Sequence, residues 1–165
     1  MRSVIVGAGA IGAYLGARMA RAGQDVTLFA RGPHLRAMRE RGVRVTGPEG
    51  DFEAKPAVAD SLDAIGPTDV VFLGVKAHSL PELAPRLRPL LGPETAVVSM
   101  QNGVPWWFFQ GFGGEFDGLR LERVDPGGVI AASIEPRRVV GSIVYLSSEI
   151  VEPGVVRHIE GNRIS

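Results

Sequence analysis

Three glycines near the N-terminus have the spacing of a turn that binds phosphate groups. The turn follows a β-branched run at 3–6 and opens a helical segment expected over 10–22. Its residues are Gly7, Gly9, Ala10, Ile11 and Gly12. In such a G-x-G-x-x-G turn the first glycine permits a tight bend, the second lets the backbone approach a pyrophosphate, and the third allows close helix packing. Because helix amides favour bound phosphate, the stretch predicts a dinucleotide site, although a turn needed only for packing would look the same.

The second expected strand, 25–29, is followed by a basic residue, Arg31. At this place dinucleotide-binding folds commonly have an acidic residue that accepts hydrogen bonds from ribose hydroxyls. Here the strand is followed by Ala30, Arg31 and Gly32, and no acid occurs from 26 to 39. A guanidinium group can instead pair with a 2′-phosphate in a fork geometry. Arg31 therefore favours NADP(H) as the cofactor, and disfavours a flavin or S-adenosylmethionine. The alternative is a solvated arginine in an arginine-rich stretch.

Two polar side chains follow the ends of two further expected strands. Lys76 comes after the apolar run 69–74, and Asn102 comes after the run 95–100. Because open α/β sheets bind ligands at the carboxyl ends of their strands, both residues are candidate ligand contacts. A lysine there could donate to a carboxylate or carbonyl group, and an asparagine could fix a ribose or substrate hydroxyl. An ordinary loop role is the alternative for each.

Composition narrows the class of protein. The net charge is zero at pH 7, which gives no reason to expect a nucleic-acid partner. No apolar run reaches the roughly 18 residues of a membrane helix, and no signal region opens the chain, so we expect a cytoplasmic protein. The chain has no cysteine, which excludes disulfides and thiolate chemistry, and its three dispersed histidines predict no metal site. A length of 165 residues suits one domain, 1–165.

The order of expected elements predicts the fold class. Strands alternate with helices at 10–22 and 33–41 and a proline-punctuated helical stretch at 78–91. We also expect a hairpin of 43–46 with 51–57, and strands at 139–149 and 155–159 joined at 152–154. Such alternation is typical of an α/β fold of the Rossmann type: a doubly wound, mostly parallel sheet with helices on both faces.

Five short motifs, taken in order, make the chain recognisable. They are GAGAIG at 7–12, Ala-Arg-Gly at 30–32, Val-Lys-Ala at 75–77, Gln-Asn-Gly at 101–103 and Pro-Gly-Val-Val-Arg-His at 153–158. Together they resemble the N-terminal domain of the ketopantoate reductases (2-dehydropantoate 2-reductases). The resemblance runs over nearly the whole chain, and five ordered motifs are far more specific than the glycine pattern alone.

The resemblance implies NADPH-dependent reduction of a 2-keto acid to a 2-hydroxy acid, on the route to pantothenate. It implies that the glycine turn holds the pyrophosphate, that Arg31 holds the 2′-phosphate, and that Lys76 and Asn102 lie near the nicotinamide ribose and the substrate. In this family the proton-donating lysine and a substrate-binding acid come from a helical C-terminal domain. We therefore expect no catalytic acid within these 165 residues, which would bind the cofactor but turn over little.

One stretch departs from the family pattern. An ordinary helical segment is expected after residue 103, but 104–124 is rich in glycine and aromatic residues, with Trp106, Trp107, Phe108, Phe109 and Phe112 close together. This cluster could reshape the substrate pocket, or it could belong to the core or to an interface with the further domain or a second subunit of a homodimer. It leaves open which 2-keto acid is the substrate. A non-catalytic domain that senses NADP is the alternative from another functional class.

Overall fold

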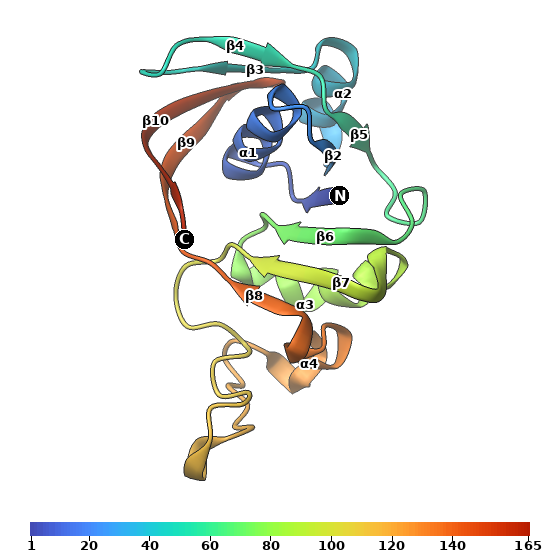
Figure 1. Ribbon diagram of the computed structural model, residues 1–165, viewed down its shortest axis with the longest axis vertical. Coiled ribbons are helices and arrows are strands. Elements are labelled where there is room, and N and C mark those ends of the chain that lie inside the picture. Colours follow the sequence, from blue (N-terminus) through green and yellow to red (C-terminus); the bar gives the residue numbers. More distant parts are fainter.

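A computed structural model describes residues 1–165, and six parallel strands form its main sheet (Figure 1). The strand order is β5-β2-β1-β6-β7-β8. The strands are β1 (Arg2–Val6), β2 (Asp25–Phe29), β5 (Ala57–Ala59), β6 (Thr68–Leu73), β7 (Leu91–Ser99) and β8 (Val139–Gly141). The order runs outward in both directions from the neighbouring strands β1 and β6, as in a doubly wound sheet. The predicted fold class is confirmed.

The central strand β1 is buried on both faces, as a parallel strand covered by helices must be. Val4 and Val6 point to one face, where they join a core under α3 (Leu80–Leu83) and α4 (Val129–Ser133). Ile5 points to the other face and packs with residues of α1 (Ala10–Arg21). Helices therefore lie on both faces of the sheet, and both cores meet at the strand that leads into the glycine turn.

A second sheet covers the outer side of α1, and the sequence did not predict it. Its order is β4-β3-β10-β9, formed by β3 (Val43–Thr46), β4 (Phe52–Ala54), β9 (Val144–Glu152) and β10 (Val155–Ile164). Only the β3–β10 pair is parallel. Figure 1 shows α1 enclosed between this sheet and the main one. The small residues of α1, such as Ala13 and Ala17, are fully buried there.

The expected strand 139–149 is two strands in different sheets. After β8 the chain crosses from the main sheet to the second sheet, and Ser142 marks the crossing by donating from its amide and its hydroxyl to the carbonyl of Ser99, at 3.1 and 2.8 Å. The hairpin of β3 with β4 is confirmed, but Ala57–Ala59 leaves it and pairs with β2 as β5. The turn at 152–154 joins β9 to β10 as predicted.

The helical stretch expected over 78–91 is mostly 3₁₀-helix. It comprises η1 (Ala77–Ser79), α3 and η2 (Ala84–Leu90). The helix that precedes this stretch along the chain is α2 (Gly32–Arg41). Prolines at 81, 85 and 89 lack the amide hydrogen that an α-helix needs, which explains the tighter, broken winding. No helix of the structure has the length and apolarity required to cross a membrane.

The aromatic segment 104–124 forms turns that protrude from the end of the molecule opposite to β3 and β4 (Figure 1). Trp106 is 2% exposed and belongs to the core, whereas Phe108, Phe112 and Phe116 are 42–57% exposed. The phenylalanine rings contact one another, with centroid separations of 4.9–5.9 Å. The expected ordinary helix is absent, and the core interpretation holds for Trp106 and, in part, for Trp107, which packs against the same core.

Candidate functional site

The glycine turn lies where β1 and β6 end, at the point where the strand order reverses. Gly7 has φ +100°, a conformation that favours glycine, and a Cβ there would lie 2.5 Å from a Val75 methyl group. A Cβ at Gly12 would overlap the carbonyl oxygen of Gly7. Gly74, at the end of β6, approaches the same oxygen, and its Cβ would lie 2.7 Å away. Three of these glycines are therefore required by the packing of strand, turn and helix.

Gly9 differs from its neighbours in the turn. It is the N-cap of α1 with φ −73°, it is exposed, and a Cβ added there would meet nothing within 4 Å. Packing within the protein thus gives no reason for a glycine at this position. Open space in front of a helix N-terminus is what a pyrophosphate needs for close approach to the backbone. The turn fits the diphosphate of a dinucleotide.

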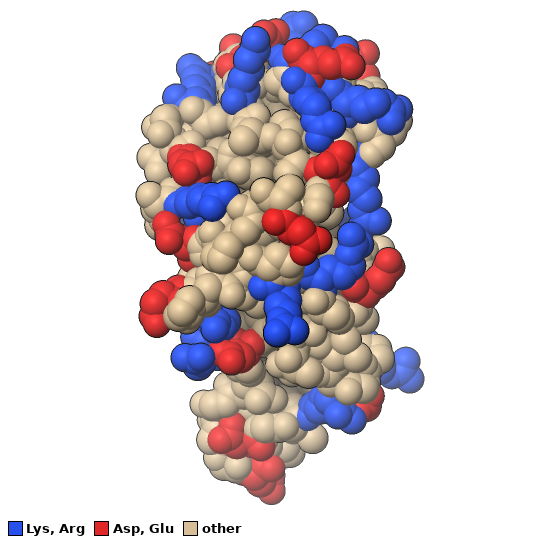
Figure 2. Space-filling model, turned by 90° about the vertical axis from the view of Figure 1, so that its right-hand side faces the viewer, with Lys and Arg blue, Asp and Glu red and all other residues tan.

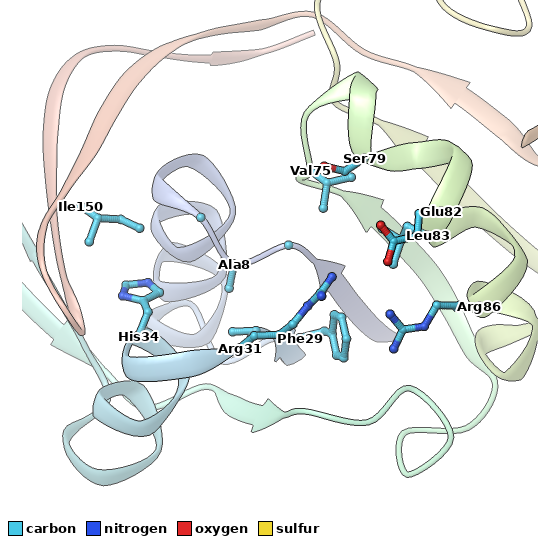
Figure 3. Close-up of a pocket in the computed structure, with 13 residues that line it drawn as sticks. Ala8, Phe29, Arg31, His34, Val75, Ser79, Glu82, Leu83, Arg86 and Ile150 are labelled. Carbon is cyan, nitrogen blue, oxygen red and sulfur yellow. The ribbon is translucent and has the colours of Figure 1, made fainter. Parts of the chain in front are cut away.

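A groove of about 440 Å³ begins at the glycine turn and continues past the end of β2; we call it the Arg31 groove. It is bounded by Gly7 and Gly9 at one end, by Phe29 and Arg31 below, and by Ser79, Leu83 and Arg86 on the far wall. Figure 3 shows the Arg31 side chain extending into this groove from the start of α2. The structure therefore brings Arg31 and the glycine turn to one site, as the sequence predicted.

Arg31 is the only arginine of the stretch from 31 to 44 that both lacks an ion-pair partner and lines the groove, since Arg36 is also without an ion pair but does not line it. Arg39, Arg41 and Arg44 pair with acidic neighbours at 3.3, 3.6 and 3.4 Å. In Figure 2 blue and red side chains are intermixed at the end of the molecule that holds α2, β3 and β4. Arg31 is in none of the eight ion pairs of the structure. Its charge is available to an anion in the groove.

A second groove of about 810 Å³ adjoins the first across the glycine turn; we call it the Lys76 groove. Gly7, Gly9, Ala10 and Ile11 line one side of it, and Gly74, Lys76, His78 and Asn102 line the other. Gly9 and Lys76 therefore lie at the same end of the sheet. The two grooves share Gly7 and Gly9, so an extended ligand could cross the turn with its diphosphate at Gly9 and one half in each groove.

Gln101 fixes the chain beside Lys76, a role that sequence reasoning missed. Its amide nitrogen donates to the carbonyls of Leu73 and Val75, at 2.8 and 2.9 Å. Its amide oxygen accepts from the Ser99 hydroxyl at 2.9 Å. The side chain thereby ties the end of β7 to the turn after β6. The sequence signal was the Gln-Asn-Gly motif itself, of which only Asn102 was singled out.

Asn102 borders the Lys76 groove and also connects the two sheets. Its amide donates to the carbonyl of Val144 at 3.4 Å and accepts from the amide of Val144 at 3.3 Å. Both bonds are long and exposed, so they are weak. The side chain thus holds the start of β9 against the loop that follows β7, at the rim of the groove.

The second sheet supplies groove residues that sequence reasoning missed. Val144, Leu146 and Ser148 of β9 line the Lys76 groove, and Ile150 lines the Arg31 groove. They follow the period of two of a strand, so one face of β9 lies over both grooves. The hydroxyl of Ser148 is buried and has no hydrogen-bond partner in the protein. An unsatisfied hydroxyl beside a groove indicates a polar ligand group or water as its partner.

His34 joins α2 to the turn between β9 and β10 at the edge of the Arg31 groove. Its Nδ1 accepts a hydrogen bond from the amide of Gly154 at 3.0 Å, so this nitrogen carries no proton and the imidazole ring is neutral. Its Nε2 is buried without a partner. Burial lowers the pKa of His34 below its ordinary value of 6.5. His158, in contrast, stacks on Tyr14 within the core and is structural.

From the half-buried, neutral His34 we predict a loss of stability in mild acid. Because the pKa of His34 is lower in the folded protein, the unfolded chain binds a proton below pH 6.5 that the folded chain does not bind. The free energy of unfolding therefore decreases as the pH is lowered. The stabilising contribution of neutral His34 is fully present above pH 6.5 and is lost as the pH falls from 6.5 to the lower pKa that His34 has in the folded protein. Urea unfolding at several pH values should show a smaller loss for His34→Gln, which cannot titrate. Identical pH dependences would contradict the prediction.

Comparison with known proteins identifies the family. The family model "Ketopantoate reductase PanE/ApbA" matches residues 3–105. A 2-dehydropantoate 2-reductase from Mesorhizobium japonicum is 48% identical over 100% of this chain and 51% of its own length. A crystal structure of a 2-dehydropantoate 2-reductase from Geobacter metallireducens superposes with a TM-score of 0.78 at 30% identity, covering 99% of this chain and 48% of the other.

A further crystal structure, from Ralstonia solanacearum and of ketopantoate reductase type, superposes with a TM-score of 0.91 at 44% identity, covering 99% of this chain and 50% of the other. The chain thus spans about half the length of the relatives it matches. The family model covers the glycine turn, Arg31, Lys76 and Asn102, which are the residues that the structure gathers around the two grooves. On these matches, the chain belongs to the ketopantoate reductase (PanE/ApbA) family.

Proposed function

We propose that this chain binds NADP(H) and forms the cofactor-binding part of a reductase that converts a 2-keto acid, such as 2-dehydropantoate, to the 2-hydroxy acid. The observation that carries the cofactor assignment is the unpaired Arg31 in the groove that begins at the glycine turn. The fold alone does not choose the cofactor: a D-mandelate dehydrogenase of the same fold, 20% identical, was solved with NADH. The positive charge of Arg31 after the end of β2 is the feature that favours NADP(H) over NAD(H) in this proposal.

In this proposal each groove takes one half of the cofactor. The adenosine half lies in the Arg31 groove, the diphosphate lies at Gly9, and the nicotinamide half lies in the Lys76 groove beside Ala10 and Ile11. The chemistry that such a cofactor supplies is hydride transfer to the keto carbon. Lys76 and Asn102 hold the nicotinamide ribose and the substrate, and a lysine there offsets the carboxylate of a keto acid. No residue of the chain is assigned as the proton donor.

The substrate class follows from the relatives, which are 2-dehydropantoate 2-reductases. The aromatic segment does not enter either groove, because none of its tryptophans or phenylalanines lines them. Trp106 does border a small hollow beside Gln101 and Asn102. The polar rim of the Lys76 groove is therefore the surface that meets the keto acid in this proposal.

Calorimetric titration with NADPH and with NADH tests the cofactor assignment. We expect NADPH to bind at least about tenfold more tightly than NADH, because a charge-assisted contact with phosphate contributes roughly 1.5–3 kcal/mol. Arg31→Ala should weaken NADPH binding by about tenfold to a hundredfold and leave NADH binding nearly unchanged. Arg36→Ala, five residues further along the same arginine-rich stretch and outside both grooves, is the matched control. Equal affinities of the wild type for the two nucleotides would contradict the assignment.

A further inference from the structure

We propose that Arg86 is a second recognition residue for the 2′-phosphate, and that Arg31 and Arg86 hold this phosphate between them from opposite walls of the Arg31 groove. The inference rests on the proposed binding of NADP(H) and adds a specificity-determining residue to it. Arg86 belongs to no motif of the sequence. It is one of two arginines in the proline-punctuated stretch of η2, and only its place in the fold distinguishes it.

The two arginines come from separate elements and meet in one groove. Arg31 is the N-cap of α2, in the segment that follows β2. Arg86 lies in η2, in the segment that follows β6 on the other side of β1 in the sheet. Both line the Arg31 groove. Figure 3 shows the Arg86 guanidinium group pointing across the groove toward the Arg31 side, with the Phe29 ring between their bases. A phosphate bound above Phe29 would therefore lie between the two side chains.

The backbone of η2 is anchored where Arg86 leaves it. Its neighbours Leu83 and Leu87 are buried in the core, at 3% and 0% exposure. Pro85 and Pro89 restrict the backbone on either side. The wall that carries Arg86 is thus anchored, while the side chain itself is exposed to the groove. An anchored cation loses less conformational freedom on binding than one on a mobile loop.

The charges of the groove favour an anion only when Arg86 is counted. The charged residues that line it are Arg31, Arg86 and Glu82, and His34 is neutral. Arg31 and Glu82 alone would sum to zero, and Arg86 leaves one net positive charge. Neither arginine forms an ion pair, although Glu82 is one helical turn from Arg86. Two unpaired guanidinium groups that line one groove repel each other, and a doubly charged phosphate between them offsets this repulsion.

Titration of NADPH and NADH into Arg86→Ala and Arg88→Ala tests the assignment. Arg88 is the matched control, because it lies in the same short helix but lines only a hollow with Asp60 and Asp63, which Arg86 also borders. We expect Arg86→Ala to weaken NADPH binding about tenfold and to leave NADH binding within about twofold. Arg88→Ala should change neither affinity. Thermal unfolding of both variants checks that the exposed substitutions leave the fold intact.

The double variant Arg31→Ala, Arg86→Ala completes the test. We expect the double variant to bind NADPH more weakly than either single variant does and to retain no preference for NADPH over NADH. If Arg86→Ala binds NADPH as well as Arg88→Ala does while Arg31→Ala loses affinity, Arg86 has no role and the proposed function stands. If Arg86→Ala weakens NADPH and NADH equally, its contact is elsewhere on the nucleotide and the 2′-phosphate assignment is overturned. If the wild type itself shows no preference for NADPH, the proposed function fails.

Discussion

A Gly9→Ala variant is expected to fold like the wild type and to bind nucleotide at least about a hundredfold more weakly. The added methyl group meets no protein atom within 4 Å, and φ at Gly9 is −73°, which alanine adopts without strain. At the N-cap of α1 the change should cost about 1 kcal/mol, because glycine is preferred over alanine at this position. The methyl group would instead occupy the space in which a diphosphate approaches the helix amides, and the loss of two charge-assisted bonds accounts for the expected factor.

Urea unfolding and calorimetric titration of the same preparation separate the two effects. Gly92→Ala is the matched control, because Gly92 lies in β7 outside both grooves and its Cβ would have ordinary contacts at 3.5 and 3.6 Å. It should bind nucleotide as the wild type does. If Gly9→Ala binds with unchanged affinity, the turn is a packing feature and the diphosphate does not lie at Gly9.

Local sequence patterns were enough to predict the candidate site residues that lie next to expected strands. Gly7, Gly9 and Gly12 occur in one turn, and Arg31 follows the very next strand, so their placement near one another follows from some 30 consecutive residues. Lys76 and Asn102 each follow a buried strand, and parallel strands end at the same edge of a sheet. The geometry was thus implied by the pattern of elements, and the structure brings these residues to adjoining grooves.

The second sheet could not be predicted because its pairing is not local. Alternation of residues showed that β9 and β10 are strands, but not that β10 pairs with β3, where Val156 lies opposite Val45. Such a pairing depends on α1, which both sheets enclose. The groove residues of β9, among them Ser148 and Ile150, were therefore out of reach, and so was Arg86, whose significance comes from the wall that it shares.

The aromatic segment was the other region where patterns failed. Trp106 and Phe112 are six residues apart and both aromatic, yet one is 2% exposed and the other 57%. Glycines with positive φ at 111, 113, 114 and 118 break any helix or strand period. Without a period, the sequence does not tell which aromatic side chain faces the core. Hydrophobicity alone predicts burial poorly where the backbone is irregular.

A Gly12→Ala variant is expected to lose about 3 kcal/mol or more of the free energy of unfolding, the upper end for overpacked sites. Alanine favours a helix by about 1 kcal/mol over glycine, so the intrinsic change at this position of α1 is stabilising. The methyl group would, however, overlap the carbonyl oxygen of Gly7 and lie 3.1 Å from a methyl group of Ile5. The carbonyl belongs to the backbone of the turn and cannot rotate aside, so helix and strand must separate.

Gly16→Ala distinguishes this clash from a general effect of alanine in α1. There the added methyl group meets the end of the Leu28 side chain, which can change rotamer, so the loss should be clearly smaller than at Gly12. Urea unfolding midpoints of the wild type and both variants make the comparison. A Gly12→Ala variant as stable as the wild type would show that α1 does not pack against the turn as closely as the structure has it. The packing of β1, turn and helix would then have to be revised together with the site that depends on it.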